Sequence, residues 1–188
     1  MHTYPDSPNV NVPADADVAK SFGLDDLRVG RHYLRDKQQA RIGAIWIDTF
    51  WMLHILPSFD HHGLLGVAVA HGEDFRGNKS SGWTKGFLAS DESTAVQELE
   101  TDPLPDLLAR LPLLQKSTSM FLDGVGYQLR IESIQIKGTL NFGNPTLPEL
   151  VAVEKSCWEL AAMLARQSRN KSLAAFTQTW RRYHERGE

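Results

Sequence analysis

The sequence lacks the residues that disulfide-stabilised and zinc-thiolate proteins need. Its 188 residues include one cysteine, Cys157, so neither an intramolecular disulfide nor a cysteine zinc cluster can form. Such sparing use of cysteine is typical of a reducing compartment, and we expect a cytoplasmic protein. The first residues show no basic start followed by an apolar run, so no secretory signal is predicted.

Long apolar runs are also missing. The longest, residues 42–56, spans 15 positions and includes Asp48 and His54. A membrane-spanning helix needs about 20 apolar residues, so no membrane partner is expected.

Positive charge is not in excess. The net charge is −3 and the pI is about 6.2, whereas proteins that bind nucleic acid through its phosphates are usually basic. The composition therefore argues against nucleic acid as the main partner. Basic residues do gather near the C terminus, at Arg166, Arg169, Lys171, Arg181, Arg182 and Arg186. They leave a nucleic-acid-associated accessory role as an alternative, although Trp180, the ring that would stack on bases, falls on an apolar helical stripe.

Motifs that mark common catalytic sites are absent. The sequence contains no G-x-S-x-G, no Walker A pattern, no G-x-G-x-x-G and no HExxH. Cys157 lies within a helical apolar stripe, where burial would raise the pKa of its thiol and favour a structural role. An enzyme is therefore not the favoured interpretation.

The composition that remains is that of an ordinary globular chain, with 41% hydrophobic and 23% charged residues. Residues 1–21 carry three prolines and few large apolar groups, which predicts a flexible or extended N-terminal arm. Residues 22–188 are predicted to form a single domain. The run 42–56 is rich in β-branched and aromatic residues and favours a buried strand or strand pair, although its spacing also fits a helix. Residues 63–70 and 83–89 are predicted to be further strands.

The C-terminal half has clearer signals. Asp123-Gly124 predicts a tight turn between residues 118–122 and a strand in which Tyr127, Leu129 and Ile131 alternate with polar residues. Beyond it the apolar residues move to even positions, which requires a turn or bulge near Ser133, with Lys137-Gly138 as a rival turn.

Two amphipathic helices are predicted to follow this sheet. Thr146 and Glu149 have the spacing of a capping box, and the apolar stripe of the first helix is Leu150, Val153, Cys157, Leu160, Ala161 and Leu164. Asn170 or Ser172 can cap the second helix, whose inner face is Leu173, Phe176, Thr177, Trp180 and Tyr183. The predicted fold class is α+β: an antiparallel sheet, or meander, packed with this C-terminal pair of helices.

An acidic segment precedes that region. Residues 91–106 contain six acidic side chains and no basic one. We expect a short helix from the Ser90–Ser93 region to Glu100, and a second over residues 106–114. The plain interpretation is a solvated helical face. The functional one is a docking surface for a basic partner, formed by Asp91, Glu92, Glu98, Glu100 and Asp102.

A histidine-rich segment offers the alternative chemistry. His61, His62, His71 and Glu73 flank a predicted strand, and imidazoles with carboxylates can hold a divalent metal. Adjacent histidines cannot both point to one side of a regular strand, so loop polarity is the plainer interpretation. For His54 and Asp48 we expect a core histidine with a hydrogen-bonded partner.

The sequence favours a non-enzymatic protein-binding module without a cofactor. Such a module would occlude or scaffold another protein, as an immunity protein, inhibitor or adaptor does, and its partner would present a basic surface. The first alternative is a metal-dependent hydrolase that uses the His61, His62 and His71 region. The nucleic-acid accessory role is the second, and a homo-oligomer stays open.

Overall fold

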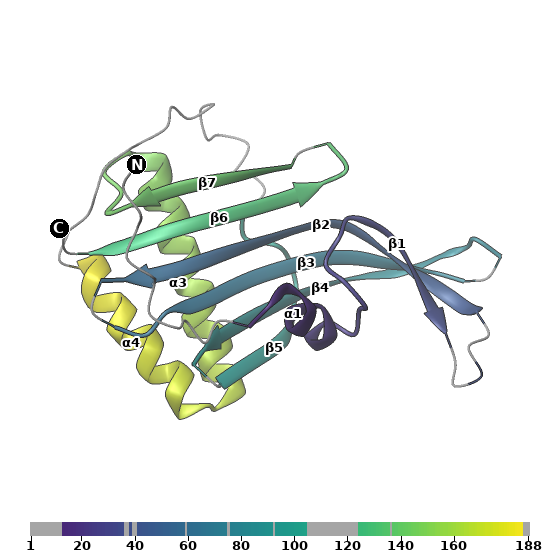
Figure 1. Cartoon of the computed structure of the whole chain (residues 1–188), viewed down its shortest axis with the longest axis horizontal. Coiled ribbons are helices and arrows are strands. Elements are labelled where there is room, and N and C mark those ends of the chain that lie inside the picture. Colours follow the sequence, from purple (N-terminus) through teal and green to yellow (C-terminus); the bar gives the residue numbers. More distant parts are fainter. Residues whose placement is uncertain are drawn as a thin grey trace, which may run out of the picture.

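The computed structural model describes residues 13–35, 38, 41–58, 60–74, 76–91, 93–104, 124–135 and 137–185. It shows an antiparallel sheet with a C-terminal pair of helices, which confirms the α+β fold class (Figure 1). The elements are, in chain order, α1 (Asp15–Ser21), β1 (Gly30–Arg35), β2 (Arg41–Pro57), β3 (Gly63–Glu73), β4 (Lys79–Ser90), β5 (Ser93–Leu99), β6 (Val125–Ser133), β7 (Lys137–Gly143), α3 (Pro148–Ser168) and α4 (Lys171–Glu185).

The 17-residue strand β2 belongs to a seven-stranded sheet, in which six strands follow the order β5-β4-β3-β2-β6-β7 and β1 pairs with β2 outside this order. Its first part pairs with β1 and its second part, from Thr49 onward, pairs with β6. The apolar run 42–56 is thus one long strand, as favoured, and its helical interpretation is wrong. Its side chains are apolar on both faces because both faces of the sheet carry a core.

Alternate residues of β2 separate these two cores. Trp51, Leu53 and Ile55 point to the face that α3 and α4 cover, which we call the helix-side face. Phe50 and Met52 point to the opposite face. A β-bulge between Ile47 and Thr49 shifts this alternation by one residue.

The opposite face is covered by the segment around α1. Val18, Phe22 and Leu24 pack on it, and the Phe22 ring lies 6.4 Å from Trp83 and 6.1 Å from Phe87. Residues 15–21, predicted as part of the arm, therefore form a helix with a buried side, while residues 1–12 lie outside the described residues. The division between arm and domain at residue 21 stays a prediction.

The two C-terminal helices carry the predicted apolar stripes, and every residue of the α3 stripe is buried. Asn170 caps α4, because its Oδ1 accepts hydrogen bonds from the backbone N–H of Ser172 at 2.9 Å and of Leu173 at 3.2 Å. The predicted capping box is wrong. Leu147 is the N-cap of α3 without a side-chain bond, and Pro148 occupies the first helical position, which its fixed φ favours.

None of the described helices combines the length and the apolar character that a membrane crossing needs.

The acidic segment departs most from its prediction. Ser93–Leu99 form strand β5 at the edge of the sheet, not a helix. Ser90 pairs with Ser93, and Asp91 has a φ of 51°, so a two-residue hairpin loop joins β4 to β5. Such loops favour Asp at positive φ, which is a signal that the helical prediction passed over. The second predicted helix, 106–114, lies outside the described residues.

Strand β6 forms a hairpin with β7, and the turn after Ser133 confirms the first of the two predicted registers. Lys137 pairs with Glu132 inside that hairpin, so the rival turn at Lys137-Gly138 is wrong. Both edges of β6 are occupied, by β2 and β7. The predicted hairpin across Asp123-Gly124 stays a prediction, because residues 105–123 lie outside the described residues.

The sheet is longer than the helices that cover it. In Figure 1, β2, β3 and β4 run on to the right of α3 and α4, where β1 joins them. We call this part the overhang: β1, Arg41–Asp48 of β2, Ala70–Glu73 of β3 and Lys79–Trp83 of β4. We call the remaining sheet, which α3 and α4 cover, the covered part. On the helix-side face, core side chains come from the covered part alone.

Candidate functional site

The predicted metal ligands are not brought together. His61 and His62 precede β3, whereas His71 and Glu73 lie at its far end. The eight residue steps from Gly63 to His71 correspond to about 26 Å along an extended strand. Within the part of the chain that the structure describes, no three His, Cys, Asp or Glu side chains are grouped to hold a metal ion.

Each of these residues has a local environment of its own. His61 Nδ1 lies 3.0 Å from Asp91 Oδ1 at the exposed β4–β5 turn. Burial lowers the pKa of His62, whose backbone carbonyl accepts a hydrogen bond from Ser90 Oγ at 3.1 Å. Glu73 forms a half-buried ion pair with Arg31 of β1. These contacts are those of separate surface and strand-end residues.

The predicted acidic docking surface is also divided. Asp91 lies at one end of β5, while Glu98 and Glu100 lie near the other. Glu98 faces Lys85 across the β4–β5 pair. Asp102 turns inward: its Oδ1 accepts hydrogen bonds from Trp51 Nε1 at 2.9 Å and from the backbone N–H of Leu104 at 3.0 Å, and burial raises its pKa. Glu92 lies outside the described residues.

A hollow of about 300 Å³ marks the boundary between the covered part and the overhang. It is lined by Asp48, Val69, Ala70, His71, Gly82, Trp83, Thr84, Glu98, Leu99 and Glu100. Three neighbouring strands contribute directly paired residues to its floor: Val69 of β3, Thr84 of β4 and Leu99 of β5. Val69 and Leu99 also contact the helix-side core, so the hollow begins where the covered part ends.

Toward the overhang, the lining of the hollow includes His71 and Gly82, which pair with each other. Trp46 is the partner of His71 on β2 and lies next to the lining. Trp46 and His71 stack with ring centroids 6.4 Å apart and planes inclined by 17°. Gly82 of β4, the direct partner of His71, has no side chain.

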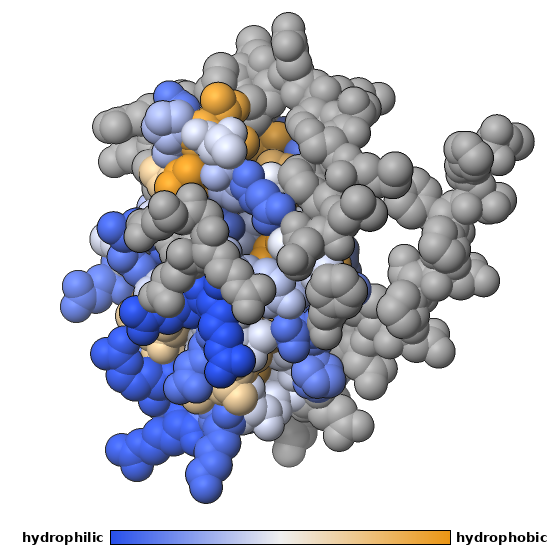
Figure 2. All heavy atoms as spheres, turned by 90° about the vertical axis from the view of Figure 1, so that its left-hand side faces the viewer, coloured by the Kyte–Doolittle hydropathy of each residue, from blue (hydrophilic) through white to orange (hydrophobic). Residues whose placement is uncertain are grey.

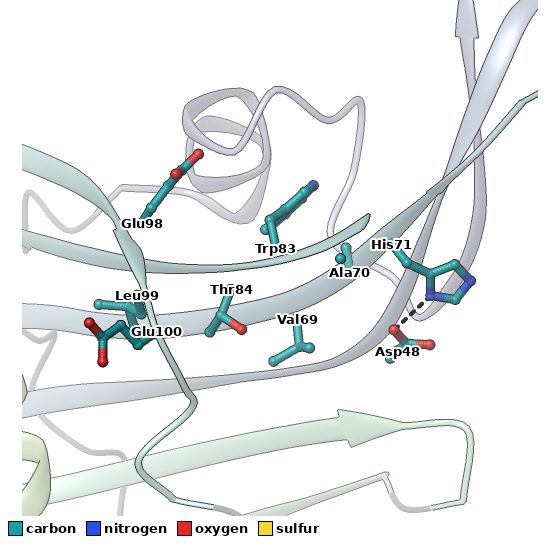
Figure 3. A pocket seen from close by; sticks show the side chains of 10 residues that line it. Asp48, Val69, Ala70, His71, Trp83, Thr84, Glu98, Leu99 and Glu100 are labelled. Carbon is teal, nitrogen blue, oxygen red and sulfur yellow. Dashed lines mark hydrogen bonds and ion pairs between the residues drawn. The ribbon is translucent and has the colours of Figure 1, made fainter. Parts of the chain in front are cut away.

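Asp48 and His71 form the best-defined polar contact of the hollow (Figure 3). Asp48 Oδ2 accepts a hydrogen bond from His71 Nδ1 at 2.9 Å. The β-bulge at Asp48 turns this carboxylate toward the face that carries His71. The Asp48 side chain stays 43% exposed and that of His71 18% exposed.

The hollow carries negative charge. Its lining includes three carboxylates, at Asp48, Glu98 and Glu100, and contains no lysine or arginine. Figure 3 shows Glu98 on the side of Trp83, while Glu100 lies with Thr84 and Val69 on the other side of the strands. Asp48 and Glu100 are therefore the two carboxylates that flank the floor on the helix-side face.

Sequence reasoning missed this site for a definable reason. It considered Asp48 and His54 of the same strand together, as a core histidine with a hydrogen-bonded partner, whereas Asp48 bonds to His71 of β3. His54 lies in the covered part, where burial, together with the nearby Arg130, lowers its pKa. Asp48 is the only carboxylate within the apolar run, and this could have indicated a polar site at that position. The bulge itself could not be predicted, because in a run that is apolar on both faces the alternation of side chains does not show a shift by one residue.

The basic residues near the C terminus lie on the outside of the helix pair. Arg166, Arg169, Lys171 and Arg182 are exposed, and Figure 2 shows hydrophilic side chains gathered over α4. Trp180, by contrast, is fully buried and its Nε1 donates a hydrogen bond to Tyr127 Oη at 2.7 Å. Trp180 therefore cannot stack on a base, which agrees with its predicted position on the apolar stripe of the helix. Arg186 lies outside the described residues.

Buried titratable groups are concentrated beneath α3. Tyr127 Oη donates a hydrogen bond to Glu154 Oε1, and burial raises the pKa of Tyr127. Burial also raises the pKa of Cys157, which is fully enclosed. The free thiol is thus kept protonated inside the core, away from the hollow.

Comparisons with known proteins find no match: no family model, no curated protein and no solved structure matches the chain.

Proposed function

We propose that this protein is a non-enzymatic binding module that takes a basic segment of another protein into the hollow and onto the overhang. One observation carries the proposal: Asp48 and Glu100 flank the floor of the hollow on the helix-side face, and the lining contains no lysine or arginine. A partner held in this way would be occluded or scaffolded, which is the action of an inhibitor, an immunity protein or an adaptor.

The floor of the hollow suits an amphipathic side chain. Val69 and Leu99 offer apolar surface, and Asp48 and Glu100 flank it. Three strand spacings, or about 14 Å, separate β2 from β5, so cations at the two ends would come from two residues of the partner. Lysine and arginine bury an apolar stem while their charge reaches a carboxylate. Complementary charge also steers the encounter between partners.

The Asp48–His71 pair suits a binding site. Among the described residues, the hydrogen bond of the His71 ring is the one to Asp48. The pair then fixes a carboxylate in place for a cation, a role that needs no nucleophile.

The test is affinity capture with the full chain and two matched charge reversals. Glu100→Lys places a cation at the rim of the hollow, and Glu159→Lys makes the same charge change on the exposed surface of α3. We expect a protein that the wild type and Glu159→Lys both retain, and that Glu100→Lys loses. That protein, once purified, should bind with an affinity that Glu100→Lys lowers at least tenfold by titration calorimetry, a loss of about 1.4 kcal/mol. Identical capture by all three baits would refute the proposed site.

A further inference from the structure

We infer that the cation recognised at the overhang side of the hollow is an arginine, whose guanidinium stacks on the Trp46 ring and pairs with the Asp48 carboxylate. This inference rests on the proposed function and names the residue type that the partner presents. It follows from a comparison of two neighbouring positions on the same face of the overhang.

The first position already holds a guanidinium, that of Arg31. Its guanidinium forms a half-buried ion pair with Glu73 and lies 5.6 Å from the centre of the Tyr33 ring. One carboxylate and one aromatic ring thus bind one arginine side chain on this surface. The arrangement is an intramolecular example of cation–π contact combined with charge pairing.

The second position repeats these components one row nearer the hollow. Trp46 is the direct cross-strand partner of Arg31 on one side and of His71 on the other, so all three side chains share a face. Trp46 is partly exposed, and Asp48 follows two residues later on the same strand. Among the described contacts of Asp48, Oδ2 bonds to His71, and the side chain is 43% exposed, so an incoming donor can reach the carboxylate.

Arginine fits this position better than lysine. A guanidinium is planar, so it can lie flat on an indole ring while its N–H groups reach a carboxylate in the same plane. A lysine ammonium is a strongly hydrated point charge that makes one of these contacts at a time. The bond from His71 fixes the Asp48 carboxylate, and Gly82 leaves the neighbouring β4 position without a side chain.

Three synthetic peptides test this choice on the full chain. Each is an acetylated and amidated glycine-rich peptide with two arginines four residues apart, and in its counterparts both arginines are replaced by lysine or by neutral citrulline. Binding is followed through the indole N–H signals in ¹H–¹⁵N spectra, where Trp46→Phe assigns the signal of Trp46. We expect the arginine peptide to shift the Trp46 signal and to bind about fivefold more tightly than the lysine peptide. The citrulline peptide should not bind.

Two variants test the contact with the indole ring and the contact with the carboxylate separately. Trp46→Leu should bring the affinity for the arginine peptide down to that for the lysine peptide, whereas Asp48→Asn should weaken both. Glu159→Gln on α3 should change neither, and the dispersion of each spectrum verifies that the variant is folded. Equal affinity for arginine and lysine, an arginine preference that survives in Trp46→Leu, or no binding by any peptide would overturn the inference. Capture of a partner that still depends on Glu100 would, in that case, leave the proposed function standing.

Discussion

Trp51 and Trp46 lie on the same strand and on the same face of the sheet, yet they have different surroundings. Trp51, in the covered part, is 1% exposed, and its Nε1 donates a hydrogen bond to Asp102. Trp46, in the overhang, remains partly exposed and stacks on His71. The difference arises from α3 and α4, which extend over one part of the strand and end before the other. An aromatic residue in a strand is therefore core or contact surface according to what covers it.

The tyrosines repeat this contrast. Tyr127 is buried under α3, where it bonds to Glu154 and Trp180. Tyr33 is 46% exposed on the overhang beside Arg31. Tyr127 thus finds its polar partners on the helices, while Arg31 of the overhang pairs with Glu73 of the sheet. We expect the covered part to determine stability and the overhang to determine binding.

The largest effect is expected from the two tryptophans themselves. Trp51→Ala should lower the free energy of unfolding by about 3–5 kcal/mol, because it opens a cavity in the helix-side core and leaves Asp102 without its indole donor. Trp46→Ala should lower it by less than about 1 kcal/mol, as expected of a partly exposed residue. Urea denaturation of both variants measures the difference. Losses of similar size would contradict the separation between the covered part and the overhang.

Two glycines of the covered part, one beneath α4 and one in an edge strand, provide a second pair. A Cβ on Gly63 would lie 2.1 Å from the Phe176 ring of α4, so Gly63→Ala should cost about 1–3 kcal/mol through displaced packing. A Cβ on Gly138, in edge strand β7, would meet no atom within 4 Å. Gly138→Ala should therefore change stability by no more than about 0.5 kcal/mol. Thermal unfolding of the two variants is sufficient, and a harmless Gly63→Ala would show that α4 is free to move away from the sheet.

The helices and the sheet differ in how much of their structure could be predicted from the sequence. The stripes of α3 and α4 and the Asn170 cap were predictable, because helical periodicity and capping depend on residues close in the chain. The pairing of Asp48 with His71 was not, because it joins two strands through a bulge that a doubly apolar strand does not reveal. Strand β5 was mistaken for a helix, because its acidic residues also fit a solvated helical face and the tight turn at Asp91 was not recognised.

The smallest effect concerns the histidines His54 and His62 and the pH dependence of stability. Burial lowers the pKa of both histidines in the folded protein below the ordinary histidine value of 6.5. The unfolded chain therefore takes up protons at these positions at a higher pH than the folded protein does. Below pH 6.5 the unfolded state binds more protons, and the free energy of unfolding should fall as the pH decreases from 7.5 to 5.5. Urea midpoints across this range measure the slope.

His54→Gln should reduce that slope, and adding His62→Gln should reduce it further. Asp102 acts in the opposite sense, because a carboxyl with a raised pKa gains stability as it becomes protonated. Since Asp102 is present in all three proteins, its contribution cancels in the comparison between variants and the histidine contribution remains. An unchanged slope in the double variant would mean that these side chains are solvated in the folded protein.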